Sequence, residues 1–144
     1  MHSDIDAQES TLAPHLTVTG GNKALDFYQA AFGAMVMDKV TADDGSRVRH
    51  AVLRIHDSLI FLSDEFPENG AGAIPSPATL GGTPVALQLS YPTTEEADAA
   101  FRRAVDAGAE ILTPMTDLES GTRFGRLRDP FGHVWSFVGP LALS

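Results

Sequence analysis

Hydrophobic and polar residues along this chain follow two patterns, one with the period of a β-strand and one with that of an α-helix. Over residues 15–19 the sequence HLTVT alternates and is rich in β-branched residues, which is typical of a strand. Leu25, Tyr28 and Phe32 then recur at helical spacing, and Gly33 follows where a helix commonly ends. The pattern predicts a short strand followed by a helix.

Three further strands are predicted after this helix, over residues 35–41, 48–55 and 59–62, with polar turns between them. Residues 66–84 then hold four prolines and four glycines, a density that neither a helix nor an internal strand tolerates. We therefore predict a linker over residues 66–83. Long linkers in compact domains often act as lids or contact partners.

The second half of the chain repeats this order of elements. A strand is predicted over residues 85–91, and Thr93 with Glu96 forms a capping box that opens a second helix. Three strands follow this helix, over residues 111–115, 123–128 and 133–138. The turn before the last strand reads DPFG, in which Pro fixes φ and Gly accepts a positive φ.

Two β-α-β-β-β halves therefore make up the chain, residues 14–65 and 84–139. We predict a single domain over residues 14–144, after a solvated tail of residues 1–13. Each half has one helix to cover one face of its sheet, so the other face must be covered by the partner half, by a second chain or by a ligand. The prediction is an α+β fold in which two βαβββ modules form a cupped mixed β-sheet around a cavity.

Composition limits the classes of function. A chain of 144 residues with 43% hydrophobic residues has the size of one domain with a core. It has no Cys, which excludes disulfides, thiolate nucleophiles and Cys-based metal sites. Its formal charge of −9 would repel a nucleic-acid backbone. The acidic start of the chain and the lack of a membrane-length apolar run lead us to expect a cytoplasmic protein that binds neither nucleic acid nor membrane.

Two motifs resemble a known family. With the paired modules, FYQAAFG at residues 27–33 and DPFGH at residues 129–133 resemble the vicinal oxygen chelate superfamily, which includes glyoxalase I, extradiol dioxygenases and bleomycin-resistance proteins. Within it, PHL at residues 14–16, HA at residues 50–51 and RFGR at residues 123–126 are most similar to the PhnB-like branch. The resemblance implies the glyoxalase/bleomycin resistance fold.

Members of that superfamily that catalyse reactions hold a divalent metal in the cup, commonly through a His or Gln from the opening strand of a half and a Glu from the closing strand. The corresponding positions in this chain are Ala13 or His15, Phe61 or Ser63, Gln88 and Ser136. None of them is a carboxylate, although a buried divalent ion needs negative or several hard oxygen ligands. We therefore expect no metal and no other cofactor. If a divalent metal is present, its ligands are His15 and Gln88, and Asp64 and Glu65 lie near the end of a closing strand.

The candidate ligand-binding residues are His15, His50, Phe61, Ser63, Gln88, Arg123 and Ser136. His15 either acts as a ligand or general base, because its ordinary pKa lies near neutrality, or only forms a hydrogen bond at the rim of the cup. His50 alternates with Val48 and Val52, so we expect it to share their face, where it lines the cup or packs in the core.

Six of the ten basic residues lie on or beside the third strand of each half. They are Arg47, Arg49, Arg54, Arg123, Arg126 and Arg128. These arginines either line an anion site for carboxylate or phosphate groups, or face water and pair with acidic residues. Arg123 is the strongest single candidate for an anion contact, because it lies in the run that resembles the PhnB-like branch.

Three functions are consistent with these residues, and whether the protein is an enzyme stays open. The first is a PhnB-like protein that binds a small molecule in the cup without a metal, for sequestration or resistance. The second is a metal-dependent lyase, isomerase or dioxygenase of the glyoxalase type. The third, a demethylubiquinone methyltransferase-like activity, follows a description that PhnB-like relatives often carry, but no nucleotide-binding glycine pattern supports it. We expect a homodimer, with modules paired within one chain or swapped across two.

Overall fold

The computed structural model describes residues 12–141, so residues 1–11 of the predicted tail lie outside the described residues. The first module contains β1 (His15–Val18), α1 (Gly21–Phe32), β2 (Met35–Thr41), β3 (Val48–Ile55) and β4 (Ser58–Asp64). The second module contains β5 (Ala86–Ser90), α3 (Thr94–Ala107), β6 (Glu110–Asp117), β7 (Thr122–Arg128) and β8 (Val134–Pro140). Both modules have the predicted βαβββ order, and the predicted α+β fold is confirmed.

The strands form two mixed four-stranded sheets of the same topology. Their orders are β1-β4-β3-β2 and β5-β8-β7-β6. The first strand of each module pairs in parallel with the last, and the other neighbours are antiparallel. β1 and β5 therefore each form one edge of their sheet, and no strand pairing joins the two sheets within residues 12–141.

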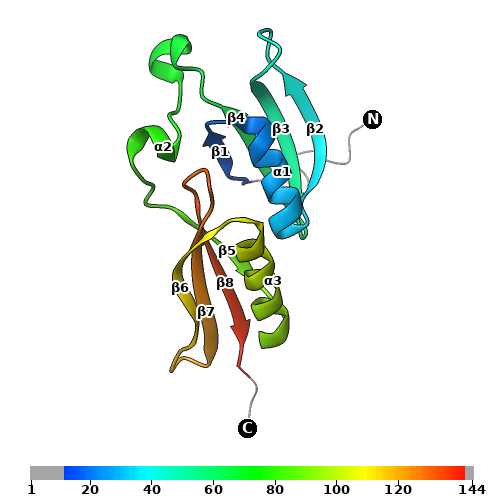
Figure 1. Cartoon of the computed structure of the whole chain (residues 1–144), viewed down its shortest axis with the longest axis vertical. Helices are drawn as coiled ribbons and strands as arrows, with labels where there is room; N and C mark the ends of the chain where they lie inside the picture. Colours follow the sequence, from blue (N-terminus) through cyan, green and yellow to red (C-terminus); the bar gives the residue numbers. More distant parts are fainter. Residues whose placement is uncertain (1–11, 142–144) are drawn as a thin grey trace.

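The helices of both modules meet in one core. Figure 1 shows the two modules one above the other, with α1 and α3 in line along the same side. The two helices contact each other, and buried apolar side chains of both modules belong to one cluster that includes Leu53, Leu62, Leu127 and Phe137. Burying such a side chain contributes about 1.5–3 kcal/mol to stability. The faces of the sheets that the helices cover therefore hold the two modules together.

A buried carboxylate also links the modules. Asp129 accepts a hydrogen bond of 2.5 Å from the hydroxyl of Tyr28 on α1 and one of 2.9 Å from Trp135 Nε1. Its other oxygen accepts two backbone N–H groups of its own turn. His133 Nε2, in the same turn, lies 2.9 Å from the carbonyl oxygen of Thr17 on β1. The DPFGH turn thus fixes the last hairpin against the first module.

Both acidic residues at the end of β4 are engaged in structural hydrogen bonds. Asp64 is buried and accepts the backbone N–H groups of Gly20 and Gly21 at 2.9 Å and that of Val48 at 2.7 Å. Glu65 accepts hydrogen bonds from Thr19, Ser76 and Thr79. Asp64 thereby satisfies free donors at the start of α1, which the glycines there cannot do with a side chain.

The predicted linker contains two short helices that the sequence pattern did not predict. They are the 3-10 helix η1 (Pro67–Gly72) and α2 (Pro77–Leu80). Ser76 is the N-cap of α2, and its hydroxyl accepts the Thr79 N–H at 3.4 Å. Proline fits the first turn of a helix because its missing N–H has no partner there in any case.

Within residues 12–141 the structure has no helix of the length and apolar character needed to span a membrane.

Candidate functional site

Each sheet has one face covered by its helix and one face turned away from it, which we call the open face. In the first sheet, four predicted binding residues meet on the open face. His15 Nε2 lies 3.0 Å from Ser63 Oγ. Phe61 is the strand partner of His15, and its ring centroid lies 5.6 Å from that of His50. The structure therefore brings together His15, His50, Phe61 and Ser63.

The pKa of His15 is lowered by partial burial and, to a smaller extent, by the proximity of His50. A lowered pKa keeps the imidazole neutral at and above neutral pH, where one ring nitrogen donates and the other accepts a hydrogen bond. At pH 7 this corner of the first sheet thus presents a neutral imidazole, a hydroxyl and an aromatic ring.

The prediction that His50 shares a face with both Val48 and Val52 is wrong for Val48. The register of β2 against β3 shifts where Thr41 pairs with Val48, so strict alternation stops there. Val48 packs in the core cluster, and its N–H reaches Asp64. His50 lies beside Phe61 on the open face instead.

In the second sheet the open face carries Gln88, Ser136 and Arg126, which is one of the six arginines named from the sequence but not the one expected to be the strongest candidate. Gln88 on β5 is the strand partner of Ser136 on β8, which is 2% exposed. Arg126 on β7 pairs with Ser136 from the other side and donates from Nε to its hydroxyl at 3.0 Å. The Arg126 guanidinium lies over the ring of Phe124, 5.0 Å from its centroid.

The structure places Arg123 away from these residues. Its guanidinium donates to Asp98 on α3 at 2.7 Å and to Asp117 on β6 at 2.8 Å. The Asp98 and Asp117 contacts raise the Arg123 pKa. Arg123 is therefore an ion-paired residue on the side of α3, whereas Arg126 is the arginine that lies beside Gln88 and Ser136.

The alternation of residues along β7 indicates why Arg126, and not Arg123, lies on the open face. Gly125 and Leu127 are buried towards the helix, where Phe101 of α3 lies close to Gly125. Arg123 has the same parity as these two residues, and Arg126 has the opposite parity. The family resemblance of the RFGR run drew attention to Arg123, although the period of two favours Arg126 for the open face.

The donor set on the open faces does not fit a divalent cation. His15, Ser63, Gln88 and Ser136 are neutral, and the Ser136 hydroxyl already contacts a guanidinium. Asp64 and Glu65 are committed to backbone and hydroxyl donors. In the part of the chain that the structure describes, no three His, Asp or Glu side chains are grouped so that they could hold a metal ion.

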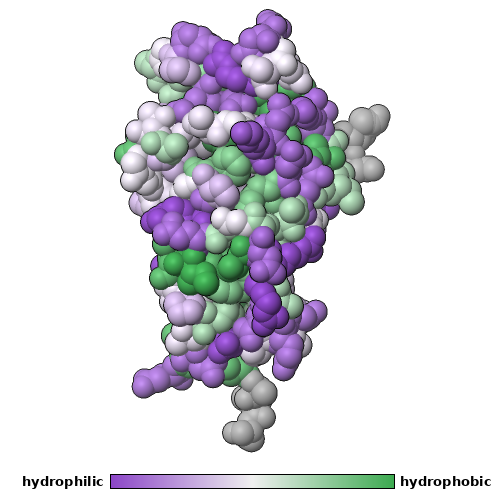
Figure 2. Space-filling model, in the orientation of Figure 1, coloured by the Kyte–Doolittle hydropathy of each residue, from purple (hydrophilic) through white to green (hydrophobic). Residues whose placement is uncertain are grey.

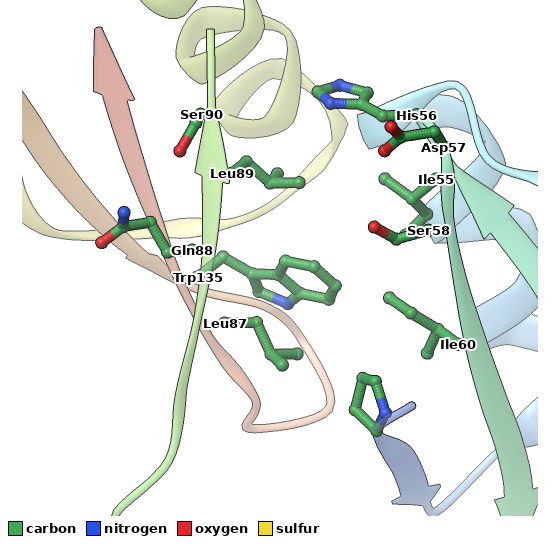
Figure 3. A pocket seen from close by; sticks show the side chains of 11 residues that line it. Ile55, His56, Asp57, Ser58, Ile60, Leu87, Gln88, Leu89, Ser90 and Trp135 are labelled. Carbon is green, nitrogen blue, oxygen red and sulfur yellow. The ribbon is translucent and has the colours of Figure 1, made fainter. Parts of the chain in front are cut away.

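A cavity of about 350 Å³ lies between the two modules (Figure 3). Ile55 and Ile60 of the first sheet line one side, and Leu87 and Trp135 of the second sheet line the other. These side chains point towards one another in Figure 3, whereas Gln88 points to the opposite side of β5. The helix-covered faces thus face each other in one chain, and the two open faces turn apart.

A second apolar depression lies on the outer side of the second module. Figure 2 shows hydrophobic residues gathered there, near β6 and α3. Phe101, Val105, Ile111 and Met115 line this groove beside the Arg123 ion pair. It lies on the helix side of the sheet, so it is separate from the residues on the open face.

The chain matches the family model of the Glyoxalase/Bleomycin resistance protein/Dioxygenase superfamily over residues 11–137. It is 41% identical over 133 residues to an uncharacterized protein of Mycobacterium bovis, covering 92% of this chain and 85% of that protein. The solved structure of an Arabidopsis thaliana gene product is 28% identical with a TM-score of 0.66, covering 90% of this chain and 96% of the other. The PhnB protein of Bacillus cereus is 21% identical with a TM-score of 0.67, covering 92% and 100%, which is a likeness of fold. This chain belongs to the Glyoxalase/Bleomycin resistance protein/Dioxygenase superfamily.

Proposed function

We propose that this protein binds a small organic molecule on the open faces of its sheets, without a metal ion. The observation that carries the proposal is the set of side chains at those positions. His15, Ser63, Gln88 and Ser136 are neutral hydrogen-bonding groups, and Arg126 adds a positive charge. Such a set binds polar groups of an organic ligand, whereas a divalent ion prefers carboxylates.

Apolar surface beside these groups supports an organic ligand. Phe61 in the first sheet and Phe124 and Val138 in the second are half-buried and lie on the open faces. Ligand pockets are mostly apolar, with a few polar groups that fix the orientation of the ligand. Each open face has this composition, and within residues 12–141 the long helix of each module lies on the other face of its sheet.

We further propose that two copies complete the site, with the first sheet of one protomer facing the second sheet of its partner. The open faces turn apart within one chain, so the two half-sites can meet only across a dimer. Met35 and Val40, on the open face of the first sheet, are 59% and 43% exposed. A symmetric dimer would build two identical sites and cover these side chains.

The motifs at residues 14–16, 50–51 and 123–126 favour the PhnB-like branch for this chain. A cytoplasmic protein that sequesters a small molecule fits the sequence and the open-face residues, and it requires no catalytic group. The described residues of the open faces support this metal-free binding more strongly than a glyoxalase-type metal reaction.

A fluorescence titration with the neutral apolar dye N-phenylnaphthylamine tests the proposal. We expect saturable binding to protein dialysed against EDTA, because no metal takes part. Phe61→Ala should weaken binding by roughly tenfold, since it removes about 1–2 kcal/mol of apolar contact. Leu80→Ala, in α2 and 65% exposed, is the matched control and should bind as the wild type does. Binding that is absent, that survives Phe61→Ala unchanged or that needs added Zn²⁺, Ni²⁺, Fe²⁺ or Mn²⁺ would contradict the proposal.

A further inference from the structure

We infer that the ligand carries an anionic group, a carboxylate, sulfonate or phosphate, and that Arg126 binds it. This inference rests on the proposed function, since it names the chemical class of the molecule that the open faces take. It also assigns to Arg126 a role in ligand specificity.

The terminal nitrogens of Arg126 have no partner among residues 12–141. Nε donates to Ser136 and the guanidinium lies over Phe124, but Nη1 and Nη2 make no hydrogen bond or ion pair there. Arg is always charged in proteins and has five N–H donors in a planar fork. Four of these donors are therefore held on the half-buried open face, in the geometry that suits two oxygens of one anion.

Four other arginines on or beside the strands of this acidic protein are neutralised by carboxylates. Arg47 pairs with Asp44 and Glu68, Arg49 with Asp43, Arg123 with Asp98 and Asp117, and Arg128 with Glu110. A chain with a formal charge of −9 has ample acid for this. Arg126 has no such carboxylate in the described part of the chain, which leaves its charge available to a ligand.

The surroundings of Arg126 on the open face favour an anion. Its strand neighbours there are Thr113 on β6 and Ser136 on β8, both neutral, with Gln88 next beyond Ser136. Glu110 is engaged by Arg128 at 3.0 Å. Because its neighbours are neutral, the positive charge of the guanidinium repels a cation and attracts an anion. Partial burial strengthens this effect, since it reduces the screening by water.

The contact of Ser136 with Arg126 is a second reason to expect an anionic ligand. By the family resemblance this position corresponds to the carboxylate of the metal-binding members, but here a hydroxyl holds the Nε of Arg126 at 3.0 Å. A fixed positive charge therefore lies beside the position where a metal enzyme has a negative ligand.

Phe124 further narrows the class of ligand. Its ring holds the guanidinium in place by a cation–π contact and presents apolar surface on the same face. An apolar or aromatic molecule with one anionic group would contact both. Inorganic phosphate alone would use the arginine and leave the apolar surface exposed.

Two dyes with the same apolar skeleton test the inference. Anilinonaphthalene sulfonate carries a sulfonate, and N-phenylnaphthylamine lacks it. We expect wild-type protein to bind the anionic dye about tenfold or more tightly than the neutral one, as a charge-assisted contact provides. Arg126→Gln should abolish this preference while leaving the neutral dye bound, and Arg126→Lys should restore part of it.

Arg128→Gln is the matched control, since it removes a neighbouring arginine that already has a carboxylate partner. It should retain the preference of the wild type. Equal binding of the two dyes, or a preference that survives Arg126→Gln, would overturn the inference and leave the proposed function standing. Failure of the wild type to bind the neutral dye would instead overturn the proposed function. The urea midpoint of each variant shows whether it is folded.

Discussion

Asp129 shows how a single residue can fix a long-range arrangement. The residue is 3% exposed, and its carboxylate accepts hydrogen bonds from Tyr28, Trp135 and two backbone N–H groups. A buried carboxylate is costly unless every lone pair has a donor, and here donors from α1, the turn and β8 meet that need. The residue therefore links a helix of the first module to the hairpin of the second.

Tyr28→Phe should destabilise the protein by about 1–3 kcal/mol, because it leaves the buried Asp129 carboxylate with one donor fewer. Urea unfolding followed by tryptophan fluorescence measures the effect. Tyr91→Phe is the control, since the Tyr91 hydroxyl has no hydrogen-bond partner within residues 12–141. A Tyr28→Phe protein as stable as Tyr91→Phe would show that the Asp129 contact adds nothing.

The same pair predicts an alkaline loss of stability. Burial raises the pKa of Tyr28 well above its usual value, and the Asp129 charge and the hydrogen bond to Asp129 raise it further. Burial also raises the pKa of Tyr91 to about 12. Above pH ~10 the unfolded tyrosines lose their protons and the folded ones keep theirs, so stability falls as pH rises. Tyr28→Phe should flatten this slope, and an unchanged slope would contradict the assignment.

At the scale of residues, the sequence predicted which side chains share a face better than it predicted their long-range contacts. His15, His50, Phe61 and Ser63 do meet on one face, because strand alternation and the order of elements are readable from the chain. Long-range contacts are not readable in this way. The hydrogen bond from Tyr28 to Asp129 joins residues 101 positions apart, and no local sequence pattern predicts it.

At the scale of elements, the close approach of α3 to β7 depends on Gly125. A Cβ at this position would lie 2.5 Å from Met115 Sδ and 2.8 Å from Phe101 Cε1. The glycine therefore lets α3 lie directly on β7. This packing fixes the position of β7, which carries Arg126 on its other face.

Gly125→Ala should cost about 1–3 kcal/mol of stability through this overpacking. The measurement is the midpoint of urea unfolding, with Gly72→Ala as control because nothing lies within 4 Å of a Cβ added there. If Gly125→Ala were as stable as Gly72→Ala, the close helix–strand packing would not be the reason for a glycine at this position.

The elements themselves were largely predictable. The bounds of β2 and β3 agree with the prediction, and the Thr93 hydroxyl accepts the Glu96 N–H at 3.1 Å, as a capping box requires. The linker differs from the prediction, because it contains two short helices although its density of proline predicts none. Pro77 lies in the first turn of α2, the one place in a helix that suits proline.

At the scale of the whole molecule, the packing of the modules decides what kind of site the chain can form. The sequence indicated that each sheet needs cover for a second face, but it left open which partner supplies it. That choice depends on contacts between distant segments, such as His133 with the Thr17 carbonyl. Because the helix-covered faces pack together, the other module does not cover the open faces, and the proposed dimer would cover them.

A dimer through the open faces makes Val40 an interface residue. Val40→Asp should weaken self-association by about tenfold or more, because it places a charge in an apolar contact. Light scattering over a dilution series gives the molar mass. Leu118→Asp is the control, since Leu118 is 41% exposed, close to the 43% of Val40, and follows β6 at a turn. A wild-type protein that stays monomeric at high concentration would contradict the dimer.

Elemental analysis of protein purified without chelator tests most directly whether this site works without a metal. The structure predicts far less than one Ni, Zn, Fe or Mn ion per chain, because His15, Gln88 and Ser136 are neutral, Ser136 contacts a guanidinium, and no three His, Asp or Glu side chains within residues 12–141 are grouped to hold an ion. One tightly bound ion per chain that disappears in His15→Ala, but stays in the Arg128→Gln protein, would contradict the account.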